Sequence, residues 1–172
     1  ASRTAILIVG VDSEESSYIL WSRVGYYSIG AVFDLIFEGC RKFDGYVTKV
    51  GVESNAMQKI IAPLLEKERR LRGYYINPVP IMASGDKEAR IRSNVGRALM
   101  REQVWIVEGE ETAFEEERML FPGNEFRRDT LDAFEKALTD LTRPSSSAEM
   151  EEEEFEEELY QNELTRCRIT GM

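Results

Sequence analysis

An aliphatic run near the start of the chain, Ile6-Leu7-Ile8-Val9-Gly10-Val11, constrains the fold most strongly, and it ends on a carboxylate, Asp12. Its length and its β-branched residues favour a strand over a helix. Apolar residues at consecutive positions are typical of a strand that is covered on both faces, as in α/β proteins. The run therefore predicts a buried strand with Asp12 at the rim of its sheet.

Segments with strand and helix patterns alternate along the rest of the chain. A polar turn separates the first run from a second apolar segment, residues 18–24, so the two are expected to form a hairpin. Both tryptophans, Trp21 and Trp105, are expected in the core. Further helices are predicted over residues 29–43, 54–72, 84–100, 112–120 and 126–141, and strands over residues 46–53, 75–82 and 103–107. This order predicts an α/β domain with a mixed central β-sheet flanked by helices.

Composition divides the chain into a globular domain, residues 1–143, and a Ser-rich linker with an acidic tail, residues 144–172. Nine of the 32 acidic residues lie between Glu149 and Glu163, and we expect this tail to be disordered in preference to forming a solvated helix. Its sparse apolar residues offer a narrow stripe to a partner. Because residue 1 is alanine, the chain is expected to be an excised domain of a longer protein.

Several classes of function are excluded by residues that the chain lacks. Histidine is absent, which removes His-based catalytic dyads and triads and zinc sites of the His type. The two isolated cysteines argue against a disulfide framework and fit a reducing compartment. A net charge of −10 argues against nonspecific nucleic-acid binding. No apolar run reaches the about 20 residues that span a bilayer, so no membrane association is expected.

Four carboxylates form the candidate site. Asp12 and Glu53 each end a predicted strand, and Asp129 and Asp132 lie three residues apart on one predicted helix, so they share a face. If the two strands are neighbours, the acids gather and repel one another unless a cation binds. Oxygen ligands without His or Cys favour Mg²⁺ or Mn²⁺, and a pair of such ions catalyses phosphodiester hydrolysis. Alternatively, Glu53 and Asp129 are first-turn acids that stabilise their helix dipoles.

At these acids the sequence resembles the nuclease domain of viral (tailed-phage) large terminase subunits, which belongs to the RNase H-like superfamily. The resemblance covers about residues 5–142, and the Asp-x-x-Asp-Ala ending is shared with RuvC-type resolvases. The intervening Gly85–Ile91 and Phe121-Pro122-Gly123 segments also look like terminase spacing. The three motifs that carry it are Ile8-Val9-Gly10-Val11-Asp12, Val50-Gly51-Val52-Glu53-Ser54-Asn55 and Arg128-Asp129-Thr130-Leu131-Asp132-Ala133.

The resemblance implies a two-metal DNA endonuclease that cuts concatemeric viral genomes in the host cytoplasm. It implies Asp12, Glu53 and Asp129 as catalytic residues, which with Asp132 would bind two Mg²⁺ or Mn²⁺ ions. Its partners would be double-stranded DNA, a terminase ATPase domain on the same longer chain, the small terminase subunit and the portal. The chain itself lacks the phosphate-binding loop of that ATPase. At the third motif the family often has two adjacent aspartates, whereas this chain has Arg128 before Asp129. This difference leaves open which acid of the motif is the primary metal ligand.

Basic residues near the acids are candidates for phosphate contacts, although a basic helical face is often simply solvated. We select Lys87, Arg90 and Arg128 as substrate-binding residues. From its place in the first turn we expect Asp129 to be the direct metal ligand. Two other functions stay open: a RuvC-like junction resolvase, and a noncatalytic module that docks packaging partners.

Overall fold

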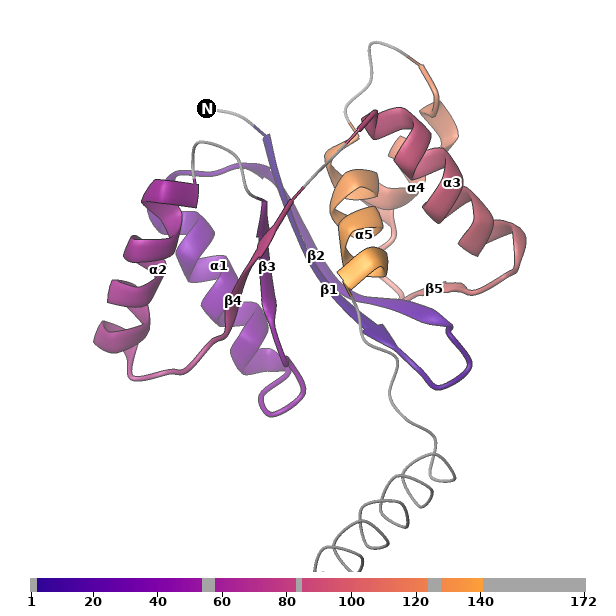
Figure 1. Ribbon diagram of the computed structural model, residues 1–172. Helices are drawn as coiled ribbons and strands as arrows, with labels where there is room; N and C mark the ends of the chain where they lie inside the picture. The colour runs from indigo at the N-terminus through magenta and orange to yellow at the C-terminus, as the bar shows by residue number, and fades with distance from the viewer. Residues whose placement is uncertain (1–2, 54–57, 83–84, 124–127, 141–172) are drawn as a thin grey trace, which may run out of the picture.

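The computed structural model describes residues 3–53, 58–82, 85–123 and 128–140, and every structural statement below concerns these residues (Figure 1). They form a mixed α/β structure, as predicted. The predicted helix start at Ser54-Asn55 and the acidic tail lie outside the described residues. The elements are β1 (Arg3–Val11), β2 (Ser17–Tyr26), α1 (Ile29–Lys42), β3 (Val50–Glu53), α2 (Gln58–Arg72), β4 (Pro78–Ile81), α3 (Lys87–Met100), β5 (Val104–Ile106), α4 (Thr112–Leu120) and α5 (Asp129–Asp140).

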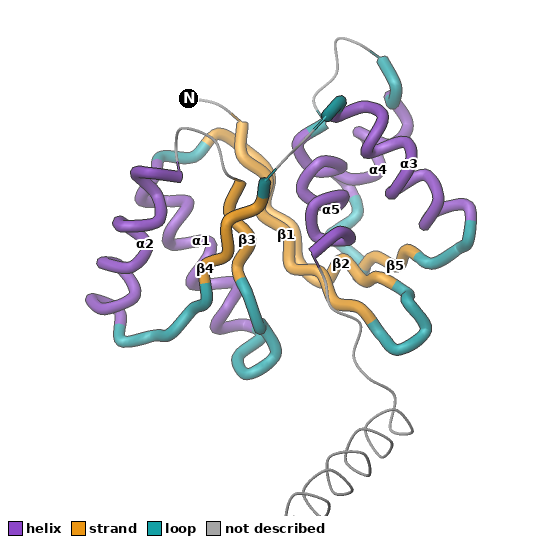
Figure 2. The backbone as a smooth tube through the Cα atoms, viewed as in Figure 1, coloured by secondary structure: helices purple, strands orange, loops and turns teal. Residues whose placement is uncertain are grey.

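The described strands form two sheets, not the single central sheet that the sequence predicts. β1 and β2 form the predicted antiparallel hairpin, and β5 joins β2 in parallel, which gives a mixed sheet of order β1-β2-β5. β3 and β4 pair in parallel as a second sheet (Figure 2). Because β1 and β3 lie in different sheets among the described strands, the expectation that the strands before Asp12 and Glu53 are neighbours is not met.

A β-bulge in the hairpin places Ile19 and Trp21, which are two residues apart on β2, on opposite faces of the sheet. Ile8 is opposite Trp21 and Val9 is opposite Ile19, so Leu20 is the extra residue. Ile19 packs into the cluster formed with α3, α4 and α5. The Trp21 ring lies instead against Gly39 of α1, where a Cβ atom would be 3.1 Å from it. Helices therefore cover both faces of the hairpin, as the aliphatic run predicts. All nine residues of β1 are nevertheless only partly buried, so the predicted buried strand is found with less burial than expected.

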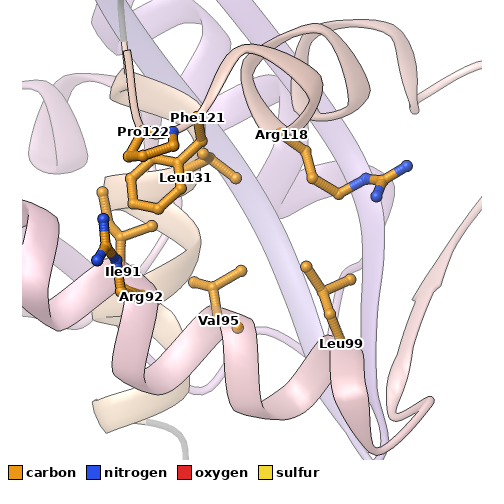
Figure 3. A pocket seen from close by; sticks show the side chains of 9 residues that line it. Ile91, Arg92, Val95, Leu99, Arg118, Phe121, Pro122 and Leu131 are labelled. Carbon is orange, nitrogen blue, oxygen red and sulfur yellow. The ribbon is translucent and has the colours of Figure 1, made fainter. Parts of the chain in front are cut away.

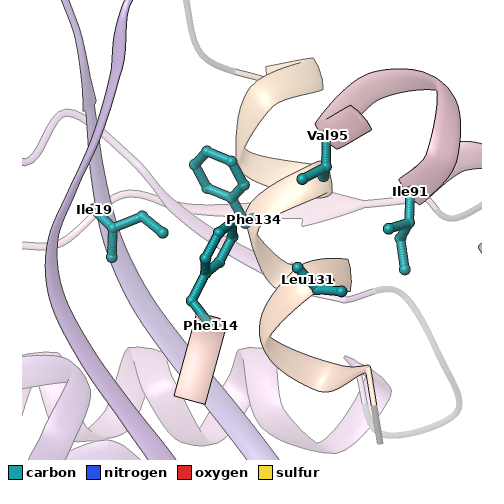
Figure 4. Packing of buried hydrophobic residues seen from close by; sticks show 6 residues of the cluster. All are labelled: Ile19, Ile91, Val95, Phe114, Leu131 and Phe134. Carbon is teal, nitrogen blue, oxygen red and sulfur yellow. The ribbon is translucent and has the colours of Figure 1, made fainter. Parts of the chain in front are cut away.

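In the described part of the chain, two apolar cores flank the hairpin. The first joins the sheet to α3, α4 and α5 through buried side chains, among them Phe114 and Phe134, whose rings meet edge to face (Figure 4). The second lies between α1, α2 and the β3–β4 pair, around the fully buried Phe37 and Leu65. Trp21 is buried as expected, but the prediction for Trp105 is wrong because 56% of its surface is exposed.

Candidate functional site

The start of α5 gathers charged side chains from five separate elements of the fold. The first core holds α5 in place through Leu131 and Phe134, and this leaves the flank of the helix to polar contacts. Among the described residues, five carboxylates meet four cations there, so this group carries one net negative charge. We call this group the α5 charge cluster: Arg3, Glu53, Lys87, Arg90, Glu117, Asp129, Asp132, Glu135 and Lys136.

Asp132 and Glu53 meet at one ammonium group. The Lys136 Nζ atom lies 2.7 Å from Asp132 Oδ2 and 3.0 Å from Glu53 Oε1. Lys136 and Asp132 are one helical turn apart and both are buried, whereas 44% of the Glu53 side chain is exposed. The structure thus brings together the end of β3 and the first turns of α5, as the sequence predicts, with a cation between the two carboxylates.

Asp129 lies beside this pair and is held by two other cations. Arg3 Nη1 lies 3.3 Å from Asp129 Oδ2, and Lys87 Nζ lies 3.9 Å from Asp129 Oδ1 and 3.2 Å from Asp132 Oδ2. Lys87 is placed by the start of α3, where the Asp86 side chain caps the helix by accepting a hydrogen bond from the Ala89 N–H. Among the four predicted ligands, Asp132 has the most buried position and contacts the most cations.

Asp12 lies elsewhere in the fold. It begins the hairpin turn, where Oδ1 accepts hydrogen bonds from the N–H groups of Glu14 and Ser16, and Oδ2 accepts one from the Tyr18 hydroxyl. Asp129 is paired with Arg3 at the opposite end of β1, and a nine-residue strand is about 30 Å long. The structure therefore does not bring Asp12 to Glu53, Asp129 and Asp132. The Tyr18 hydrogen bond, helped by the backbone N–H groups, holds the pKa of Asp12 below its ordinary value.

The described carboxylates at the start of α5 have the chemistry that the predicted metal site needs. Glu53 and Asp132 are hard oxygen ligands that already share one cationic group, the Lys136 ammonium. No group of three or more acidic or sulfur ligands arranged to hold an ion occurs within residues 3–53, 58–82, 85–123 and 128–140. The repulsion that motivated the metal prediction is met in the structure by side-chain cations.

The three predicted phosphate-binding residues differ in how exposed their side chains are and in how many acceptors they already contact. Lys87 is the most exposed, with 41% of its side chain accessible. Arg90 lies between Asp132 and Glu135, and its Nε atom is buried without a hydrogen-bond partner among the described residues. Arg128 pairs with Glu88 and donates to the Gly123 carbonyl. Lys87 is therefore the best placed of the three to contact a ligand.

Three buried charged residues of the cluster were not singled out from the sequence. Glu117 of α4 accepts hydrogen bonds from the N–H groups of Thr130 and Leu131 and from the Thr130 hydroxyl. It thereby caps α5 from another helix. Glu135 pairs with Arg90 and accepts from Asn94 Nδ2 at 2.7 Å. Lys136 was not predicted either. The one signal in the sequence was its position four residues after Asp132, at which two helical side chains can form an ion pair.

One of the described cavities is lined mostly by apolar side chains of the first core. It has a volume of about 290 Å³ and lies between α3, α4 and α5, with Ile91, Val95 and Leu131 on its walls (Figure 3). The guanidinium groups of Arg92 and Arg118 border it, but its walls are apolar. An apolar cavity does not suit a phosphate group, so we place the candidate site at the α5 charge cluster.

Comparisons with known proteins do not assign the chain. No model of a known protein family matches the sequence, and no curated protein is similar to it. No helix in the described part of the chain has the length and apolar character needed to cross a membrane.

We expect the stabilising effect of Asp132 to disappear at low pH. Burial opposes its ionisation, but Lys136 and Lys87 outweigh burial and keep the pKa of Asp132 below its ordinary value of 3.8. A lowered folded-state pKa stabilises the protein above the unfolded-state pKa, and this stabilisation is lost as the pH falls through the folded-state value. Asp132→Asn should therefore lower the free energy of unfolding at pH 7 by about 1.5–3 kcal/mol, and by less below pH of about 4.

Urea unfolding between pH 7 and pH 3 measures this difference. The matched control is Asp34→Asn, because Asp34 is 68% exposed and pairs with Arg72 at the surface. A surface ion pair contributes about 0–1 kcal/mol, so the control should change little at any pH. A difference between Asp132→Asn and the unmodified chain that stays constant from pH 7 to pH 3 would contradict the assigned role of the charge.

Proposed function

We propose that the chain is the RNase H-like nuclease domain of a viral large terminase subunit and cuts double-stranded DNA by metal-dependent phosphodiester hydrolysis. The observation that carries the proposal is the meeting of Glu53 and Asp132 around one cationic group. These residues belong to the second and third acidic motifs of the resemblance. The mixed α/β structure is compatible with that fold class.

In this proposal Glu53 and Asp132 are the first candidates to hold Mg²⁺ or Mn²⁺, and Asp129 lies next to them. Such an ion, when bound, supplies Lewis-acid activation of water and stabilises charge on phosphate oxygens. Lys87 is the side chain best placed to orient a phosphate beside the acids, because it is partly exposed and already neutralises Asp129 and Asp132. The ATPase domain, the small terminase subunit and the portal are the partners that the proposal implies.

The proposal is tested by incubating the 172-residue chain with supercoiled plasmid in Mn²⁺ and in Mg²⁺, with EDTA as the control. We expect nicked and linear DNA in the presence of metal and none with EDTA. A four-way junction in parallel identifies the resolvase alternative, which would prefer that substrate. A folded chain that leaves both substrates intact in both metals would contradict a nuclease function.

Deleting residues 145–172 is expected to preserve the fold and raise the affinity for DNA. All the described residues that form the two apolar cores precede this tail. The tail holds nine of the 32 acids, so its removal lowers the repulsion of the DNA phosphates. Because salt screens this repulsion over a Debye length of about 10 Å at 0.1 M, the gain in affinity should shrink as salt is added. Thermal unfolding and DNA binding at two salt concentrations measure both effects, and a loss of folding would contradict the domain boundary.

A further inference from the structure

The apolar cavity between α3, α4 and α5 is open to solvent and large enough for an aromatic side chain. Its volume is about 290 Å³, and its walls include the buried Ile91, Val95 and Leu131 and the partly buried Phe121 (Figure 3). Pro122 at its border is exposed, so the cavity is reached from the surface. An engineered cavity of about 150 Å³ with a similar apolar lining binds benzene. This cavity therefore has room for one aromatic ring.

Gly96 of α3 leaves part of the cavity wall without a side chain. It lines the cavity, and a Cβ atom built there would have no heavy atom within 4 Å apart from its chain neighbours and its own helix backbone. Gly96 lies inside a 14-residue helix and its φ is not positive, so the backbone does not require glycine. Glycine is less favourable than alanine in a helix interior. The position therefore favours an open cavity over a stable helix, as a binding site does.

The border of the cavity is basic. The side chains of Arg92 and Arg118 border it and are 63% and 45% exposed. Arg92 pairs with Glu88, which also pairs with Arg128, and Arg118 pairs with Glu115. These three arginines and two glutamates carry one net positive charge. Exposed ion pairs contribute little to stability, so Arg92 and Arg118 can exchange their partners for other carboxylates. The site thus suits an apolar side chain that has carboxylates beside it.

The acidic tail of the chain contains such a side chain. Phe155 follows four consecutive glutamates, residues 151–154, and precedes three more, residues 156–158. A segment with so few apolar residues and so much charge cannot bury an aromatic ring in a core of its own. The ring therefore needs a surface elsewhere, and the flanking carboxylates match the arginines at the border of the cavity.

The tail is long enough to reach the cavity. α5 ends at Asp140, and Leu131 on the cavity wall is nine residues earlier, which is about 14 Å along a helix. Phe155 comes fifteen residues after Asp140, and a flexible segment of that length has an end-to-end distance of about 20 Å. Such a connection keeps the ring near the cavity at an effective concentration of about millimolar. A weak contact is then enough for binding.

We propose that this cavity binds the acidic tail of the same chain, with the Phe155 ring in the cavity and the flanking glutamates beside Arg92 and Arg118. The covalent connection favours this occupant over an acidic segment of another protein, which would have to be present at a comparable concentration. The inference does not depend on the proposed nuclease function.

Binding of a neutral apolar dye, N-phenyl-1-naphthylamine, to the full 172-residue chain measures whether the cavity is free. Phe155→Ala should bind the dye about five- to tenfold more tightly than the unmodified chain, because the apparent affinity of a site falls with the fraction that is already occupied. Phe155→Leu keeps an apolar side chain and should resemble the unmodified chain. Salt screens the attraction between the glutamates and the arginines, so the difference made by Phe155→Ala should shrink as salt is added.

Methyl NMR locates the contact without altering the cavity. The resonances of Val95 and Leu131 should shift on Phe155→Ala, whereas those of Leu65 in the second core should not. Gly96→Leu fills the cavity and should abolish dye binding, with Gly96→Ala as the control that adds one methyl group. Thermal unfolding confirms that each variant is folded.

Equal dye affinity of the unmodified chain, Phe155→Ala and Phe155→Leu would overturn the proposal. Unchanged Val95 and Leu131 resonances in Phe155→Ala would also overturn it, because the ring would then lie elsewhere. A dye affinity of the unmodified chain that depends on protein concentration would show that the tail binds a second copy, and this would overturn binding within one chain. None of these measurements uses nuclease activity, so a failure here is distinct from a failure of the proposed function.

Discussion

Replacing Glu117 with alanine is expected to lower the free energy of unfolding by about 3–5 kcal/mol, the range found when one partner of a buried ion pair is removed. Glu117 is 5% exposed and lies 2.6 Å from Arg3 Nη1. It also accepts three hydrogen bonds from the first turn of α5, at Thr130 and Leu131. The alanine variant leaves all these donors without this acceptor in a place that water does not reach freely.

Urea unfolding at pH 7 measures this loss. Glu117→Gln keeps the size of the side chain and one oxygen, so a smaller loss of about 1–3 kcal/mol is expected. The matched control is Glu116→Ala on the exposed side of the same helix, where a change within about 0.5 kcal/mol is expected. Equal stability of Glu117→Ala and Glu116→Ala would show that the contacts of Glu117 do not hold α5 in place.

The order of strands and helices is readable from local patterns because each element depends on the spacing of its own apolar residues. α5 is an example, since Leu131, Phe134 and Leu138 recur at helical spacing and pack into the first core. The division into two sheets cannot be predicted from local patterns, because the residues of β1 or β3 do not by themselves determine which other strand each one pairs with. Trp105 shows the same limit, since an apolar residue in a short strand gives no sign of which face is covered.

The candidate site was predicted in part for the same reason. A carboxylate after an apolar strand is a pattern that both Asp12 and Glu53 satisfy, but Asp12 begins a turn between paired strands, whereas Glu53 ends β3 and leads toward a helix. Asp12 follows the end of β1, whereas Glu53 lies in the α5 charge cluster, which the start of β1 contacts. The cations Arg3 and Lys136 were not foreseen, because their contacts with Asp129 and Glu53 join residues far apart in the sequence.

Under the proposed function, Glu53→Gln should reduce metal-dependent cleavage by more than about 100-fold, while Asp12→Asn should cleave at close to the unmodified rate. A metal ion stabilises the charge of the transition state by several kcal/mol, and a change of about 1.4 kcal/mol in the activation free energy changes the rate tenfold. Glu53 is the better position for this test than the buried Asp132, because 44% of its side chain is exposed and the variant is expected to fold. Asp12 provides the control, since its carboxylate is held by the hairpin turn and Tyr18.

Cleavage rates across a manganese titration decide between the two positions, with thermal unfolding of each variant confirming that it is folded. Loss of cleavage at Glu53 alone would support a site at the α5 charge cluster, where Glu53 and Asp132 share the Lys136 ammonium. Loss at Asp12 alone would move the chemistry to the hairpin turn, at the other end of β1. That result would contradict the site proposed here, because no side chain of the cluster reaches across a strand about 30 Å long.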